Sequence, residues 1–152
     1  MYRCRRWSRN AVPAQLPFEP SQAKPWILVV EDEASIREVV REILEAEGYL
    51  VATAANGAEA LRIMEQRQPA LVLLDMCMPV LSGWDFAAAA RAQGFRMPIL
   101  IMTALPNARQ WAAEIGAQGC LTKPFDLFDL LAAVERLLQR PLSGNGRYHT
   151  PA

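Results

Sequence analysis

The sequence predicts an α/β fold in which a doubly wound parallel β-sheet carries helices on both faces. Two observations support this prediction. Five short apolar runs, typical of strands buried on both faces, alternate with longer segments whose apolar residues recur at helical spacing. Strands that alternate with helices in this way form parallel sheets. The whole pattern lies within residues 26–139, a span typical of one domain.

The first two predicted strands and the helix between them follow directly from the apolar pattern. Residues 26–30 form a continuous apolar run that stops at acidic residues, which suits a strand buried on both faces. Apolar residues then recur at helical spacing over 36–44, and Gly48 marks the end of that helix. Residues 50–54 form the second predicted strand.

The middle of the pattern contains two helices on either side of one strand. Asn56 is a good N-cap for the second helix, with Glu59 three residues further on. The third strand, 70–74, is wholly apolar and ends at Asp75. An alanine-rich helix is predicted over residues 82–93.

The last part of the pattern repeats the strand-helix unit twice. We predict the fourth strand over 98–102 and the fourth helix over 107–115. A short fifth strand over 119–122 follows. Asp126 then caps a final helix whose apolar stripe runs to Leu138.

The composition is that of an ordinary folded domain, with 52% hydrophobic and 21% charged residues. These proportions exclude a largely disordered or fibrous chain. No apolar run approaches the roughly 18 to 20 residues of a membrane span, and no secretory signal follows the basic start. The three cysteines are far apart and predict neither a disulfide framework nor a zinc site. We therefore expect a cytoplasmic protein without a membrane span.

The 16 basic and 16 acidic residues balance overall but are unevenly distributed. Residues 1–24 hold five basic residues and one acid, whereas residues 25–139 hold nine basic and fifteen acidic residues. We predict a flexible, basic, proline-rich arm over 1–25 and a short flexible tail over 140–152. Because the acidic body repels phosphate, we expect no nucleic-acid binding by the domain. The arginines of the arm and Trp7 could contact nucleic acid or an anionic membrane, although no specific function is the favoured interpretation.

Polar residues of particular types follow four of the five predicted strands. Ligands of parallel α/β sheets bind beyond the C-terminal strand ends. The sequence places there three acids, a hydroxyl and a lysine: Glu31 and Asp32, then Asp75, Thr103 and Lys123. Each alone has a plain structural role, as a helix cap, a turn residue or a solvated charge. Their gathering at one edge of the sheet predicts a site.

This set of side chains suits metal-assisted phosphoryl chemistry. Three close carboxylates cannot all remain ionised unless a cation neutralises them. Ligands that are all oxygen suit a hard ion such as Mg²⁺. A carboxylate beside that ion is a plausible nucleophile toward phosphorus, and a lysine and a hydroxyl opposite it could hold the other phosphoryl oxygens.

The same residues lie in sequence pieces that resemble the receiver domain of two-component response regulators. In chain order the pieces are ILVVEDE at 27–33, LVLLDMCMP at 71–79, Gly83, PILIMTA at 98–104, GA at 116–117 and LTKPF at 121–125. The resemblance covers about residues 26–139. It implies the flavodoxin-like (βα)5 receiver fold, with five parallel strands in the order 2-1-3-4-5.

The resemblance also implies a metal site around a phosphorylated aspartate. Asp75 would accept a phosphoryl group from a histidine kinase or a histidine phosphotransfer protein. Asp32 and the backbone carbonyl of Cys77 would join Asp75 as ligands of Mg²⁺, with Mn²⁺ as the alternative ion. Glu31 would act on the metal through water.

Four further residues correspond to the family's phosphoryl-binding and switch positions. Thr103, followed by Ala104, matches the hydroxyl that moves to meet the phosphoryl group. Lys123 matches the lysine that pairs with that group, and its bond to Pro124 is expected to be cis.

The sequence departs from the family at the switch. Receiver domains usually carry an aromatic residue three positions before the lysine, but here that position is Cys120. The segment 103–116 also looks a little short for the family. Trp111 could take over the switching role, although plain packing is the favoured interpretation. We therefore expect an unusual switch and output face.

Two positions that tune dephosphorylation in the family are Cys77 and Leu105 here. Neither side chain hydrogen-bonds an attacking water well, so we expect a long-lived phosphoryl group. Cys77 and Cys120 could also have a redox role, since a nearby metal and lysine lower a thiol pKa. Small residues that merely fill space are the favoured interpretation.

These observations predict a single-domain response regulator with no separate catalytic domain, because only residues 140–152 follow the last helix. Its output would be protein binding through the fourth helix, fifth strand and fifth helix, a phosphorelay to another histidine, or competition for a kinase's phosphoryl groups. It would act as a monomer or a phosphorylation-dependent dimer. One alternative is a degenerate receiver that binds partners without phosphorylation, which Cys120 keeps open. A metal-dependent phosphohydrolase is less favoured because Cys77, not a second acid, lies two residues after Asp75. An FMN-binding protein is disfavoured by the acids after the first strand.

Overall fold

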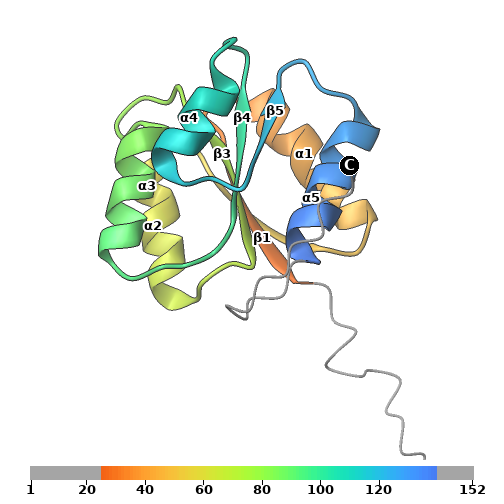
Figure 1. Ribbon diagram of the computed structural model, residues 1–152. Helices are drawn as coiled ribbons and strands as arrows, with labels where there is room; N and C mark the ends of the chain where they lie inside the picture. The colour runs from red at the N-terminus through yellow and green to blue at the C-terminus, as the bar shows by residue number, and fades with distance from the viewer. Residues whose placement is uncertain (1–24, 140–152) are drawn as a thin grey trace, which may run out of the picture.

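The computed structural model describes residues 25–139, in which five strands and five helices alternate along the chain (Figure 1). The strands are β1 (Trp26–Val30), β2 (Leu50–Ala54), β3 (Leu71–Asp75), β4 (Ile99–Thr103) and β5 (Gly119–Thr122). The helices are α1 (Ala34–Ala46), α2 (Gly57–Gln66), α3 (Gly83–Ala92), α4 (Ala108–Ile115) and α5 (Leu127–Leu138). Every element lies where the sequence predicts it. The predicted arm, except for Pro25, and the predicted tail lie outside the described residues.

The five strands form one parallel sheet in the order β2-β1-β3-β4-β5, which confirms the predicted fold class. Helices α1 and α5 cover one face of this sheet, and α2, α3 and α4 cover the other (Figure 1). The chain leaves β1 toward β2 on one side and returns to β3 on the other. This reversal opens a crevice at the C-terminal strand ends, where ligands of such sheets bind.

Each face of the sheet has its own hydrophobic core, which explains why the central strands are apolar throughout. In β1, Leu28 and Val30 pack on the side of α2 and α3, while Ile27 and Val29 pack on the side of α1 and α5. All five residues of β3 are buried, including the terminal Asp75. The two cores therefore fix β3, and Asp75 at its end, from both sides.

Helices α2 and α5 begin at the residues that the sequence marked as caps. The Asn56 side chain accepts a hydrogen bond from the backbone N–H of Glu59, and Asp126 caps α5 in the same way. Gly116 ends α4 in the left-handed conformation, with φ of 68°. In the described part of the chain, no helix is long and apolar enough to cross a membrane.

The loop between β3 and α3 is held tightly against the end of the sheet. The N–H of Gly83 donates to the Met76 carbonyl at 3.1 Å, and a Cβ on Gly83 would lie only 2.8 Å from the Met76 Cα. Between them, Val80 adopts φ of 70°, which is costly for a β-branched residue. The loop that follows Asp75 is thus constrained by close packing and by one strained residue.

Candidate functional site

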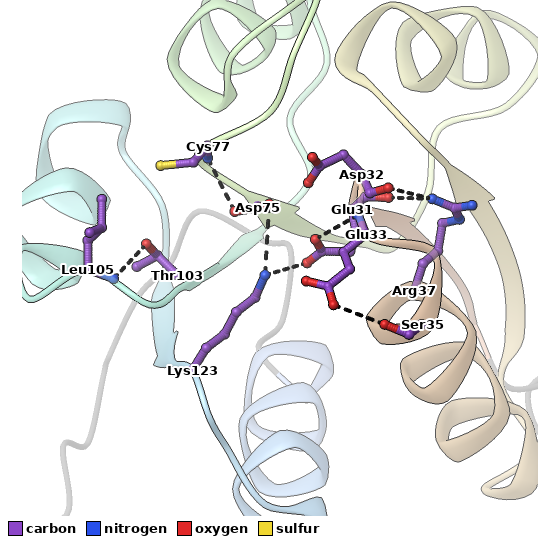
Figure 2. A network of polar contacts seen from close by, with 10 residues as sticks. All are labelled: Glu31, Asp32, Glu33, Ser35, Arg37, Asp75, Cys77, Thr103, Leu105 and Lys123. Carbon is purple, nitrogen blue, oxygen red and sulfur yellow. Dashed lines mark hydrogen bonds and ion pairs between the residues drawn. The ribbon is translucent and has the colours of Figure 1, made fainter.

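The five residues predicted to form a site line one pocket at the C-terminal edge of the sheet (Figure 2). The pocket has a volume of about 820 Å³. Its polar lining includes residues from the ends of β1, β3, β4 and β5: Glu31, Asp32, Asp75, Thr103 and Lys123. The parallel register brings these strand ends together, so that residues up to 92 positions apart in the sequence come into contact.

Three carboxylates from two strand ends form the acidic part of this pocket. Glu31, Asp32 and Asp75 each offer one oxygen, and these oxygens all lie within 4.8 Å of one another. Glu31 and Asp75 are buried, with exposed fractions of 1% and 6%, whereas Asp32 is exposed. Two buried acids beside a third are electrostatically unfavourable unless positive charge is supplied.

The carboxyl group of Asp75 shows this cost directly. Burial, reinforced by the negative charge of Glu31, raises the pKa of Asp75 to about 7. A hydrogen bond from the backbone N–H of Cys77 to Asp75 Oδ1, at 3.2 Å, lowers that pKa, as does the charge of Lys123. The balance leaves Asp75 with a strong tendency to hold a proton or to accept a cation.

Among residues 25–139, Lys123 is the basic residue that forms ion pairs with the carboxylates of this pocket. Its Nζ lies 2.6 Å from Glu31 Oε2 and 3.8 Å from Asp75 Oδ2. Its backbone N–H donates to the Thr103 carbonyl at 2.7 Å, and the following bond to Pro124 is cis. Lys123 is therefore positioned by the backbone at the end of β5 and lies between the two buried acids (Figure 2).

Thr103 lies in the same pocket, and its side-chain hydrogen bond within the described part of the chain is not to Asp75. Its hydroxyl accepts a hydrogen bond from the backbone N–H of Leu105 at 3.2 Å, and the residue is 1% exposed. Ala104 and Leu105, which are both exposed, also line the pocket. In this structure, then, the hydroxyl is bonded to the loop that precedes α4.

Arg37 is a supporting residue that the sequence analysis missed. From α1, its guanidinium donates to the backbone carbonyls of Glu31 at 2.8 Å and Asp32 at 3.3 Å. The backbone N–H of Glu33 in turn donates to Glu31 Oε1 at 3.2 Å. These bonds hold the acidic turn after β1 in place. The sequence feature that could have identified Arg37 is its place on the helix that directly follows Glu31 and Asp32.

Cys77 and Cys120, the two cysteines among the described residues, have different surroundings. The Cys77 thiol is exposed, and partial burial together with the charge of Asp75 raises its pKa. A raised pKa leaves less thiolate, which argues against a reactive thiol at Cys77. Cys120 is partly buried against the core between the sheet and α4.

Trp111 packs against Trp84 of the neighbouring helix α3. The two rings meet edge to face, with centroids 4.7 Å apart and planes at 70°. The indole N–H of Trp84 donates to Glu114 on α4 at 3.2 Å. These contacts match the packing role favoured for Trp111 from the sequence.

The donor set of the pocket fits a hard divalent cation. The three converging groups are all carboxylates, and oxygen ligands at this spacing suit Mg²⁺ or a similar ion better than a soft metal. A cation there would offset the charge that raises the pKa of Asp75. Cys77, whose carbonyl the resemblance places on the metal, lines the same pocket.

Comparisons with known proteins place the chain among proteins of one family. A family model for the response regulator receiver domain matches residues 27–135. The alkaline phosphatase synthesis transcriptional regulatory protein SphR of Synechococcus elongatus is 41% identical over 150 residues, covering 90% of this chain and 58% of SphR. The response regulator MprA of Mycobacterium is 38% identical over 122 residues, covering 79% of this chain and 53% of MprA. The chain thus spans little more than half the length of these relatives.

Two solved structures show the same architecture at significant identity. The chemotaxis protein CheY4 of Vibrio cholerae is 37% identical with a TM-score of 0.71, covering 76% of this chain and 99% of that one. The response regulator TrrA of Thermotoga maritima, solved in complex with Mg²⁺-BeF, is 36% identical with a TM-score of 0.68. That match covers 74% of this chain and 98% of TrrA.

Proposed function

Because the chain belongs to the response regulator receiver domain family, we propose that Asp75 accepts a phosphoryl group from a phosphohistidine in a Mg²⁺-dependent reaction. The observation that supports this most is the environment of Asp75. Its carboxylate is buried at the end of β3, beside two more acids and within 3.8 Å of a lysine ammonium. Such a carboxylate is oriented for attack and carries a charge that a metal would neutralise.

Asp32, Asp75 and the backbone carbonyl of Cys77 would hold the metal, with Glu31 acting through water. When bound, Mg²⁺ supplies positive charge to the carboxylates and to the transferring phosphoryl oxygens. In the transfer, an Asp75 oxygen forms the new bond to phosphorus. The bond between phosphorus and the donor's imidazole nitrogen breaks, and its electron pair remains on the ring. A proton on the other ring nitrogen lets the imidazole leave as a neutral group.

Lys123 would change partners during this reaction. Before it, the ammonium neutralises Glu31 at 2.6 Å and lies 3.8 Å from Asp75. After it, a phosphoryl oxygen on Asp75 offers a more highly charged partner at the same end of the sheet. We propose that Lys123 then bonds the phosphoryl group.

Thr103 would provide the second phosphoryl contact and the start of the switch. Its hydroxyl accepts a hydrogen bond from Leu105, so its own proton is available for donation. Rotation toward a phosphoryl oxygen would break the bond to Leu105 and release the loop at Ala104. That loop leads into α4, which is how the change would reach the surface.

The phosphoryl group is expected to be long-lived. Water attacking an aspartyl phosphate is assisted by side chains that hold it in line. Cys77 and Leu105 line the pocket at the positions that do this in the family, and a raised thiol pKa leaves Cys77 a weak partner for water.

The proposed function also implies a phosphoryl donor and a downstream protein target. A histidine kinase or phosphotransfer protein would supply the phosphoryl group, and a protein target would read the α4, β5 and α5 face. The single-domain organisation, the oligomeric state and the cytoplasmic location remain predictions, since SphR and MprA extend beyond the matched region.

The direct experiment is the intact mass of the full chain after incubation with Mg²⁺ and acetyl phosphate. We expect wild type to gain one phosphoryl group and Asp75→Asn to gain none. Asp129→Asn, an exposed acid on α5, is the matched control and should behave as wild type. Equal uptake by wild type and Asp75→Asn would remove Asp75 from the reaction. No uptake from acetyl phosphate or from a phosphorylated histidine donor would favour the degenerate receiver.

A further inference from the structure

A second hollow lies on the edge of the sheet, away from the carboxylates. It has a volume of about 660 Å³ and is formed by the start of α4, the edge strand β5 and one residue of α5. Its lining residues are Pro106, Asn107, Ala108, Arg109, Gln110, Gly119, Cys120, Thr122 and Arg136. No acidic side chain belongs to this lining.

Small residues of β5 leave room for the hollow. Cys120, on the face that α4 covers, offers only a thiol at the position where an aromatic ring was expected from the family. Gly119 has no side chain on the opposite face, where a Cβ would lie 3.5 Å from Leu137 Cδ1 and 3.7 Å from Arg136 Nη2, so the Arg136 guanidinium lies beside this edge strand. The departure at Cys120 thus leaves open space on the surface rather than a buried gap.

The two arginines of the hollow are not neutralised. Neither Arg109 nor Arg136 has a hydrogen bond or ion pair with any other described residue. By contrast, Arg37, Arg41 and Arg91 are all bonded to carbonyls or carboxylates. Glu114, the acid on α4, already accepts hydrogen bonds from Gln110 and Trp84.

The backbone adds to the positive potential of the hollow. Helix α4 starts beside it with no acidic residue in its first turn, and Asn107 makes no capping bond with its side chain. Two unpaired guanidiniums beside this helix start form a local positive region on a body that is acidic overall. Charge complementarity therefore favours a negatively charged occupant.

We propose that this hollow docks an acidic segment of a partner protein, with carboxylates on Arg109 and Arg136 and one side chain placed over Cys120. A nucleic acid is disfavoured because the acidic body repels a phosphate chain. A second copy is disfavoured because the lining of the hollow holds no acidic side chain that could pair with the arginines of the other copy. This inference rests on the proposed function, in which a protein target binds the α4, β5 and α5 face, and it adds the chemical class of that target.

The test is a fluorescence-anisotropy titration of the full chain with a short labelled peptide of Glu and Asp around one Tyr. Its neutral Gln and Asn analogue and a short single-stranded DNA are the comparison probes. We expect the acidic peptide to bind most tightly. The double variant Arg109→Glu/Arg136→Glu should weaken that binding by about tenfold or more.

The matched control reverses two other exposed arginines, Arg62 and Arg67 on and just after α2, which also have no hydrogen bond or ion pair with any residue of 25–139. Arg62→Glu/Arg67→Glu changes the net charge equally and should alter binding by no more than about twofold. Cys120→Trp, which fills the hollow, should also weaken binding. Equal losses in both double variants would show non-specific charge attraction and overturn the proposal.

Other outcomes assign the surface differently. Tighter binding of the DNA with the same arginine dependence would make the hollow a nucleic-acid site. A dimer that Arg109→Glu/Arg136→Glu dissociates would make it a contact between copies. Phosphoryl uptake is measured by mass in the same samples. Uptake without peptide binding defeats only this inference, and peptide binding without uptake defeats only the proposed function.

Discussion

The strand-end pocket and the hollow beside α4 and β5 use charge in opposite ways. In the pocket, Lys123 lies against Glu31 at 2.6 Å, and three acids converge within 4.8 Å. In the hollow, Arg109 and Arg136 have no partner among residues 25–139. A buried charge must be paired within the fold because it has lost its hydration, whereas water stabilises an exposed charge until a partner binds. The difference supports the two proposals, phosphoryl chemistry in the pocket and partner binding at the hollow.

The largest expected effect is on the free energy of unfolding when the positive charge of the pocket is removed, compared with removal of one from the hollow. Lys123→Met leaves Glu31 buried without its cation and should lower the free energy of unfolding by about 3–5 kcal/mol in the absence of Mg²⁺. Arg136→Met removes an unpaired exposed charge and should change it by no more than about 0.5 kcal/mol. Urea unfolding in EDTA measures both. Similar losses in the two variants would break the comparison.

The second prediction concerns pH and uses the raised pKa of Asp75. Because the native carboxyl holds its proton up to about pH 7 and the unfolded one only to its ordinary value near 4, the native state binds more protons between these limits. Stability from this group is therefore present at low pH and is lost as pH rises toward 7. From pH 5 to pH 8 without metal, wild type should lose roughly 2–3 kcal/mol more than Asp75→Asn.

That prediction is checked by urea unfolding of both proteins at the two pH values. Asp129→Asn should follow wild type, because that acid is exposed and outside the pocket. Parallel pH profiles of the unfolding free energy for wild type and Asp75→Asn would mean that burial and Glu31 do not raise the pKa of Asp75.

The third prediction couples the same proton to metal binding. Mg²⁺ must displace the proton from Asp75, so its affinity should rise roughly tenfold per pH unit below pH 7 and level off above it. Isothermal titration calorimetry between pH 5.5 and pH 8 measures this. An affinity independent of pH would place the cation away from Asp75.

The smallest expected effect is on the lifetime of the phosphoryl group. Leu105→Asn adds a side chain that can hydrogen-bond an attacking water, worth about 1 kcal/mol, and should speed phosphoryl loss about fivefold. Leu50→Asn changes another exposed leucine, at the far end of the sheet, and should leave the rate unchanged. The decay of the phosphorylated mass measures both. Rapid loss in wild type itself would contradict the long-lived group.

The sequence predicted the fold and the gathering of the site residues because both depend on local patterns. An apolar run that ends in an acid fixes where Asp75 lies once the sheet is parallel, and the same holds for Thr103 and Lys123. The ion pair between Lys123 and Glu31 could not be predicted, since it joins residues 92 positions apart whose side-chain directions depend on packing. The two carbonyl contacts of Arg37 depend on packing in the same way.

Two further features lay beyond sequence reasoning for a different reason. Val80 adopts a positive φ in a tight turn that the hydrogen bond from the Leu81 N–H to the Pro79 carbonyl closes at 2.8 Å. The preference of a β-branched residue opposes this conformation, so the sequence did not predict it. The hollow over Cys120 depends on the small size of Gly119 and Cys120 on β5 and on the position of Arg136 on α5. The sequence marked Cys120 as a departure but could not show what the departure leaves exposed.

The central claim, that Asp75 is the phosphoryl acceptor, is tested most directly by chemical trapping. The full chain is incubated with Mg²⁺ and acetyl phosphate and then reduced with borohydride, which converts an aspartyl phosphate to homoserine. Peptide mass spectrometry then reports which residue reacted. We predict homoserine at position 75 alone, and none when Mg²⁺ is removed. Homoserine at another acid, or at position 75 equally without Mg²⁺, would contradict the account.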